Sequence, residues 1–164
     1  MPVKPFPQKH ISLRALIQKL NLCCSVKEYT KVFKSNLLKE VDFSFYLLFD
    51  DSKYTRVVLH SDSCYELILI CWKKGQGSPI HDHADSECIM CCLKGKLEEN
   101  LYSDKEELTR LTSRDLNPLE PVHLNNTMGV HQITSLTQNS VSLHLYIPGI
   151  INGQYYDQAI DEFL

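Results

Sequence analysis

The feature that most restricts the fold of this chain is the stretch from Gly75 to Gly95, in which a loop of glycine, serine and proline leads into His81-Asp82-His83. On an extended strand, side chains two positions apart leave the same face, so the two imidazoles would point to one side. Imidazole is the commonest side-chain metal ligand and suits iron, zinc, copper and nickel. The stretch therefore predicts half of a metal site on a β-strand. The alternative at this point is a chance pair of histidines in a surface loop.

The pattern of apolar residues divides the chain into a helical first part and a β-rich second part. Ser12 and Ser25 are expected to cap two helices, because apolar residues follow them at helical spacing and Glu28 completes a capping box. Strands are predicted over residues 54–60, 64–72, 89–93, 96–102, 108–112, 122–125, 130–135 and 140–147, with a turn at 113–115. Many short strands at this spacing are typical of a sandwich or barrel.

The composition fits one soluble domain and argues against several classes of protein. With 164 residues, of which 43% are hydrophobic, the chain can bury a core without disulfides or metals. Its net charge of -3 gives no reason to expect binding to nucleic acid or to an anionic membrane. No apolar run is long enough for a membrane span, and the first residues lack the apolar segment of a secretory signal. We therefore expect a cytoplasmic monomer whose seven cysteines are reduced thiols.

A third ligand is needed to complete a metal site with open positions, and His131 is the candidate. It follows Gly129 after a turn and is expected at the start of a strand, although an ordinary surface histidine is the alternative. A structural zinc site that uses the Cys88-x-x-Cys91 spacing is a second alternative, but such a site usually has two separated ligand pairs. Glu87 could also reach the metal if a one-residue bulge turned its carboxylate inward.

Ser142, His144 and Tyr146 alternate on one predicted strand, so their side chains share a face. The hydroxyl of Ser142 could hold the imidazole, and the imidazole could hold the phenol of Tyr146, in a relay that fixes tautomer and orientation. The alternative is the polar side of a solvated strand, because the residues between them are apolar.

Together these motifs resemble those of the thiol dioxygenases, and of the cysteine dioxygenase family in particular. The stretch from Gly75 to Gly95 has the spacing of the first cupin signature, with Cys88 where an ordinary cupin carries a metal-binding glutamate. The resemblance covers roughly residues 42–157 and implies a mainly β cupin-type β-barrel (double-stranded β-helix or jelly roll) with short N-terminal helices. We accordingly expect one domain over residues 1–164, with a helical region at 1–50 and the barrel at 54–157.

The resemblance also implies a role for each candidate residue. His81, His83 and His131 would bind one ferrous ion (Fe2+) per chain, and no organic cofactor would be required. Arg56 would pair with the carboxylate of the substrate, with Tyr54 nearby, since a guanidinium can grip a carboxylate with two hydrogen bonds.

The same resemblance places Tyr146 beside the iron, oriented by Ser142 and His144. Cys88 would form a thioether cross-link with Tyr146, and we expect the strands that carry these two residues to face each other across the barrel.

The implied reaction adds both atoms of O2 to the thiolate of L-cysteine and gives cysteine sulfinic acid, a step in cysteine catabolism and taurine biosynthesis. Another thiol dioxygenase, acting on 3-mercaptopropionate or an aminothiol, is an alternative, and Arg56 favours a substrate with a carboxylate. A non-catalytic metal-binding cupin is the alternative from a different class. It is kept because the chain ends soon after Asp157 and has Gly153 where the family carries a cysteine near the pocket mouth.

Overall fold

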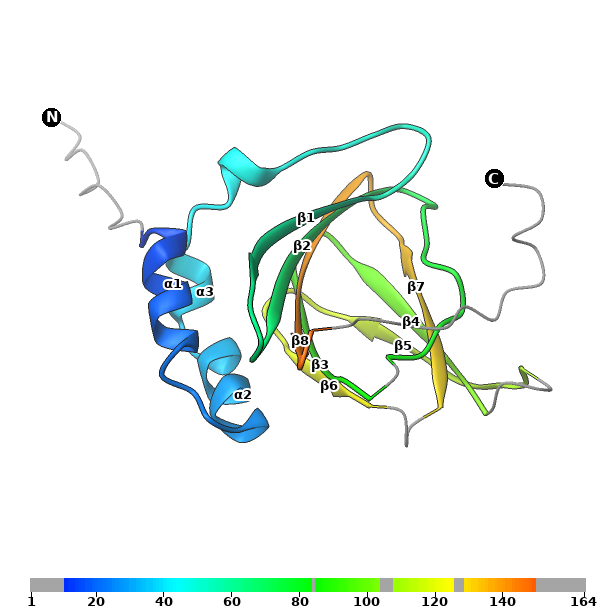
Figure 1. Cartoon of the computed structure of the whole chain (residues 1–164). Helices are drawn as coiled ribbons and strands as arrows, with labels where there is room; N and C mark the ends of the chain where they lie inside the picture. Colours follow the sequence, from blue (N-terminus) through cyan, green and yellow to red (C-terminus); the bar gives the residue numbers. More distant parts are fainter. Residues whose placement is uncertain (1–10, 84, 104–107, 126–128, 150–164) are drawn as a thin grey trace, which may run out of the picture.

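The computed structural model describes residues 11–83, 85–103, 108–125 and 129–149. In this part of the chain, a layer of short helices packs on the outer face of one β-sheet, and a second sheet faces the inner side of the first (Figure 1). Among these residues, no helix has both the length and the apolar character that a membrane span needs.

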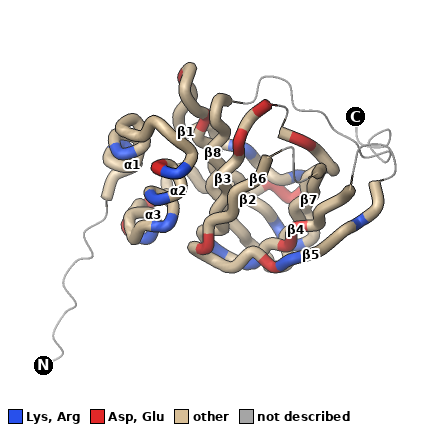
Figure 2. Tube along the Cα trace, turned by 90° about the horizontal axis from the view of Figure 1, so that it is seen from below, with Lys and Arg blue, Asp and Glu red and all other residues tan. Residues whose placement is uncertain are grey.

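The helical layer begins where the sequence predicted it. Its elements are α1 (Leu13–Leu20), α2 (Val26–Lys34), α3 (Leu37–Glu40) and the short 3-10 helix η1 (Ser44–Tyr46). The hydroxyl of Ser12 accepts a hydrogen bond from the Ala15 amide at 3.3 Å, and that of Ser25 accepts one from the Glu28 amide at 3.3 Å. Figure 2 shows Lys and Arg residues on all three α-helices. The helices therefore turn charge to solvent while their apolar side packs on the sheet.

Antiparallel strands form two sheets in the described part of the chain. They are β1 (Thr55–Ser61), β2 (Glu66–Lys73), β3 (Glu87–Lys94), β4 (Leu97–Tyr102), β5 (Arg110–Leu116), β6 (Val122–Leu124), β7 (Val130–Ser135) and β8 (Asn139–Ile147). One sheet has the order β1-β2-β8-β3-β6 and the other the order β5-β4-β7. The predicted order of strands is confirmed, but the predicted turn at 113–115 is wrong because those residues lie inside β5. All but the last residue of this edge strand are exposed, so its sequence is as polar as that of a turn.

Two apolar clusters lie on opposite faces of the five-stranded sheet. The outer cluster joins the helices to the sheet and includes Leu16, Phe33 and Leu143. The inner cluster fills the space between the sheets and includes Met90 and Ile133. Each fully buried side chain of this kind contributes about 1.5–3 kcal/mol through the hydrophobic effect. Because β2, β3 and β8 are covered on both faces, polar residues on their inner side are taken out of water.

The loop after β2 continues the smaller sheet along β7, and this pairing positions the histidines. The amide of Ser78 donates to the carbonyl of Ile133 at 2.8 Å, and the amide of His81 donates to the carbonyl of His131 at 2.9 Å. Gly77 permits the close approach, because a Cβ at that position would lie 2.9 Å from the carbonyl oxygen of Ile133.

Candidate metal centre

His81, His83 and His131 lie together between the sheets, with one ligand nitrogen from each within 4.8 Å of the others. The Nε2 atom of His131 is 3.2 Å from that of His81 and 3.0 Å from that of His83. The prediction that the first two histidines lie on a regular strand is wrong. His81 forms a single bridge with His131, and His83 lies outside the strands. The backbone pairing with β7, rather than strand periodicity, brings the imidazoles together.

The spacing and chemistry of these nitrogens fit a metal ion with open positions. Nitrogens bound at about 2.1 Å on adjacent corners of an octahedron are roughly 3.0 Å apart, whereas tetrahedral ligands are about 3.4 Å apart. The 3.0 Å spacing of His131 and His83 matches the octahedral value, and the 3.2 Å spacing of His131 and His81 lies midway between the two values. The structural zinc alternative is contradicted, because Cys88 belongs to the inner cluster and Cys91 to the outer one, on opposite faces of β3. Among the described residues, the three histidines form the sole group with metal-ligand spacing.

The surroundings keep two of the imidazoles neutral, as metal binding requires. Burial, reinforced by His131, lowers the pKa of His81 to about 3 and that of His83 to about 2. The Nδ1 of His81 lies 2.9 Å from the carbonyl oxygen of Pro79, and a neutral imidazole that donates there has its lone pair on Nε2. His81 and His83 therefore present neutral nitrogen donors at neutral pH.

A buried carboxylate orients the third histidine. The Nδ1–H of His131 donates to Glu99 on β4 at 2.9 Å, and Arg114 on β5 donates to the other carboxylate oxygen. Glu99 is 2% exposed. Burial acts to raise the pKa of its carboxyl, but the hydrogen bond from His131 and the electrostatic interactions with His131 and Arg114 outweigh it, so the pKa is lowered and the group is ionised. Such carboxylate–histidine pairs fix the tautomer and orientation of metal ligands.

A pocket opens beside the three histidines. Its lining includes both residues predicted to hold the substrate, together with the relay residues: Tyr54, Arg56, Ile70, Trp72, Ser78, His81, Asp82, His131, Ile133, His144 and Tyr146. Arg56 is exposed and has no ion-pair partner among the described residues. Tyr54 stacks on Trp72 with a ring-centroid distance of 4.6 Å. The pocket therefore combines a guanidinium, aromatic walls and the three-histidine group.

The predicted relay on β8 lies inside the barrel. Ser142 Oγ is 2.8 Å from His144 Nε2, and His144 Nδ1 is 3.4 Å from the phenol oxygen of Tyr146. The alternative of a solvated strand face is contradicted, because these side chains are 0%, 5% and 4% exposed. Burial lowers the pKa of His144 well below its usual value and raises that of Tyr146 well above its usual value. Both groups are therefore neutral at physiological pH.

A protein-family model described as "Cysteine dioxygenase type I" matches residues 4–159. The chain belongs to this family. It is 33% identical over 141 residues to cysteine dioxygenase type 1 of Rattus norvegicus, a match that covers 82% of this chain and 70% of the relative. The corresponding protein of Homo sapiens is 31% identical over 141 residues, with the same coverage of both chains.

Solved structures establish the fold of this cysteine dioxygenase family member. A Klebsiella pneumoniae protein with a double-stranded β-helix domain aligns with a TM-score of 0.60 at 12% identity, over 71% of this chain and 96% of the other. An RmlC-like cupin from Desulfovibrio desulfuricans gives 0.51 at 19% identity, over 63% and 91%. The predicted cupin barrel with short helices is confirmed. The family and the three-histidine group together indicate a metal cofactor.

The structure of this family member corrects two further expectations about residue positions. The strands that carry Cys88 and Tyr146 do not face each other across the barrel, because β3 and β8 are neighbours in one sheet, where the two residues are in register. Glu87 lies outside the three-histidine group, because its carboxylate pairs with His123 on β6. A bulge that turns it toward the metal does not occur.

Sequence reasoning missed Glu99 and Trp72, although each left a signal. Glu99 falls between Leu97 and Leu101 on the same face of a strand, so a charged residue occupies a position where the alternation predicts an apolar one. Trp72 ends an apolar strand, and its indole N–H needs a partner once it is buried. Its partner, Ser142, is supplied by a strand seventy residues away.

Proposed function

We propose that this chain is a non-haem iron dioxygenase that adds both atoms of O2 to the thiolate sulfur of L-cysteine and releases cysteine sulfinic acid. The observation that carries the proposal is the position of Arg56 in a pocket lined by two of the three grouped histidines, His81 and His131, in a chain of the cysteine dioxygenase family. The product lies two oxidation steps above the thiolate, and O2 supplies both oxygen atoms, so no external electron donor is needed.

His81, His83 and His131 would hold one Fe2+. The ion, when bound, would supply open positions at which a thiolate and O2 can meet. Because an imidazole binds a metal in its neutral form, three such ligands would leave the centre its positive charge, which favours an anionic thiolate. Glu99, behind His131, would hold that ligand in place and keep its Nε2 free for the metal.

Arg56 would bind the substrate carboxylate. Its guanidinium is exposed in the pocket and can donate two parallel hydrogen bonds to a carboxylate. Tyr54, stacked on Trp72, would form the adjacent wall. This arrangement favours L-cysteine or 3-mercaptopropionate over an aminothiol without a carboxylate. The family favours L-cysteine between the first two and disfavours a non-catalytic cupin.

Tyr146 would hold its phenol beside the reacting groups, oriented by Ser142 and His144. Cys88 would be joined to its ring by a thioether. Formation of that bond removes the thiol hydrogen and one ring hydrogen, and the two electrons and two protons pass to O2. The support for this step is the register of the two residues on adjacent strands.

The setting of the reaction is part of the same proposal. We infer a cytoplasmic monomer with one domain over residues 1–164, without nucleic-acid or membrane partners. The support is that the seven cysteines are free thiols, as expected in a reducing compartment, together with a net charge of -3. A role in taurine biosynthesis would follow from the product.

Oxygen consumption by the iron-loaded protein tests the function. L-Cysteine, 3-mercaptopropionate and cysteamine should be compared at equal concentration, with the sulfur products identified by mass spectrometry. We expect uptake with L-cysteine at one O2 per sulfinate formed, and much slower uptake with cysteamine. No uptake with any of the three thiols by protein that retains iron would overturn the proposal in favour of a non-catalytic cupin.

A further inference from the structure

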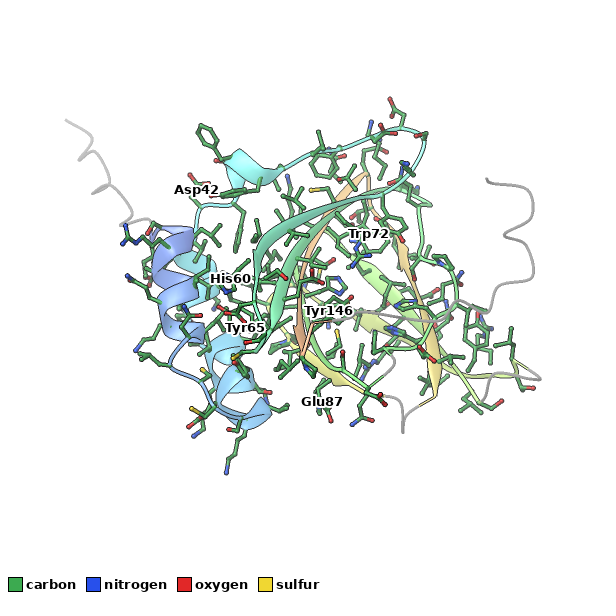
Figure 3. The ribbon with its side chains drawn as sticks, viewed as in Figure 1. Asp42, His60, Tyr65, Trp72, Glu87 and Tyr146 are labelled. Atoms are coloured by element: carbon green, nitrogen blue, oxygen red, sulfur yellow. The ribbon has the colours of Figure 1, made fainter. Side chains whose placement is uncertain are left out.

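A chain of hydrogen bonds runs from the floor of the pocket to Tyr146. The indole Nε1–H of Trp72, on β2, donates to Ser142 Oγ at 2.9 Å. Ser142 in turn contacts Nε2 of His144 at 2.8 Å, and Nδ1 of His144 contacts the phenol oxygen of Tyr146 at 3.4 Å. Figure 3 labels Trp72 and Tyr146, the two ends of this chain, which both lie in the inner cluster between the sheets.

The direction of each hydrogen bond follows from the one donor that cannot reverse. An indole N–H only donates, so Ser142 Oγ must accept from Trp72. The single hydroxyl proton of Ser142 then needs an acceptor, and among the described residues its remaining contact is His144 Nε2. Ser142 therefore donates to Nε2, which must carry a lone pair. His144 is neutral, so its one N–H is at Nδ1 and donates to Tyr146.

This direction decides where the phenol proton of Tyr146 goes. The phenol oxygen already accepts from His144, so its own O–H cannot point back along the same hydrogen bond. Tyr146 lines the pocket beside Arg56 and His81, and its hydroxyl also contacts the side chain of Cys88. We propose that Trp72 is a positioning residue whose indole N–H, acting through Ser142, fixes the tautomer of His144 and turns the phenol O–H of Tyr146 away from His144, toward the pocket and the Cys88 sulfur. A bound thiolate or oxygen species would then find a hydrogen-bond donor there.

The N–H has a role distinct from the packing of the indole ring. The ring is 1% exposed and stacks on Tyr54, contacts that any flat aromatic group of the same size would keep. Without the N–H, Ser142 Oγ is free to accept from His144, and the opposite tautomer becomes accessible. The inference concerns the site of the proposed reaction, but the tautomer exists whether or not that reaction occurs.

The test is the tautomer of His144, measured in the metal-free protein by long-range 15N–1H correlation after labelling with 15N-histidine. A His144→Gln variant assigns the signals. Trp72 is the only tryptophan in the chain, so growth of an auxotroph on 3-benzothienylalanine replaces its N–H by sulfur while the ring shape is kept. Growth on 5-fluorotryptophan, which retains the N–H, is the matched control.

We expect the Nδ1–H tautomer in the unmodified and fluorotryptophan proteins. In the benzothienylalanine protein, the ratio of the two tautomers should change by about tenfold, the effect of one hydrogen bond. The signals of His123, which pairs with Glu87 and takes no part in this series of hydrogen bonds, should not move. A Ser142→Ala variant lacks the hydroxyl that donates to His144 Nε2, so it should also change the ratio of the two tautomers.

An Nε2–H tautomer in the unmodified protein, or an unchanged tautomer after benzothienylalanine replacement, would overturn the inference. Trp72→Phe provides a second route to the same readout if the analogue is not incorporated. Oxygen uptake with L-cysteine plays no part in this result. The proposed function and the role of Trp72 therefore fail or succeed separately.

Discussion

Cys88 and Tyr146 are direct cross-strand partners in the antiparallel pair β3 and β8, and both side chains are buried on the inner face of the sheet. Opposite residues in such a pair have Cβ atoms about 4.5–5.5 Å apart, close enough for a side-chain sulfur to reach a neighbouring ring. The buried thiol has a raised pKa, mainly from desolvation, so it is protonated before any oxidation.

This register predicts a thioether between Cys88 and Tyr146 that accumulates with turnover. Denaturing gels of iron-loaded protein should show a second, faster band that increases with L-cysteine and O2, and intact mass should fall by two hydrogens. Cys88→Ser and Tyr146→Phe should each give a single band. Cys92→Ala is the matched control, because Cys92 is also on the inner face of β3 but is in register with Ser142. Peptide mapping that recovers only separate Cys88 and Tyr146 peptides after many turnovers would contradict the prediction.

Metal binding should depend on His131 and on the carboxylate behind it. His131→Ala removes one of three ligands and should abolish tight iron binding. Glu99→Gln keeps the shape but removes the charge that orients His131, and should weaken metal affinity by about 10- to 100-fold. Competition with a chromophoric chelator measures both effects. Glu98→Gln is the control, because Glu98 is next to Glu99 in the sequence and its side chain leaves the opposite face of β4. Equal weakening by both glutamine variants would contradict a specific role for Glu99.

Arg56 should set the preference for a substrate carboxylate. Hydrogen bonds to charged groups contribute about 1.5–3 kcal/mol, so Arg56→Ala should lower kcat/KM for L-cysteine by about 10- to 100-fold. The effect on cysteamine, which has no carboxylate, should be small. Arg56→Lys should recover part of the loss, since a lysine keeps the charge without the two-pronged geometry. If L-cysteine and cysteamine lose activity equally, Arg56 acts on the fold rather than on the carboxylate.

The cysteines should divide into reactive and protected thiols. Cys24 and Cys64 are exposed, whereas burial raises the pKa of Cys91 to about 12 and that of Cys92 to about 11. A raised pKa reduces the thiolate, the reactive form, and at pH 8 only about one Cys92 in a thousand would be ionised. Brief treatment with iodoacetamide, read by peptide mass spectrometry, should label the two exposed thiols and spare the buried pair until denaturant is added. Early labelling of Cys91 or Cys92 in the folded protein would contradict the burial of these two side chains.

Local sequence patterns were sufficient to predict the types of group that meet in the pocket and much of the local structure. Ser12 and Ser25 predicted their helix starts because a cap depends only on residues three positions away. The alternation of Ser142, His144 and Tyr146 predicted a shared face because strand periodicity is local. The resemblance of the motifs to the cysteine dioxygenase family then indicated the barrel and the reaction.

The way in which these groups meet could not be predicted from the sequence, because the pairing of distant strands has no local signature. The loop that carries His81 reaches His131 through backbone hydrogen bonds to β7, not through a strand of its own. Cys88 and Tyr146 became neighbours because β8 lies between β2 and β3 in the sheet. Glu99 orients His131 because the fold buries both side chains, and a buried polar group needs a hydrogen-bond partner.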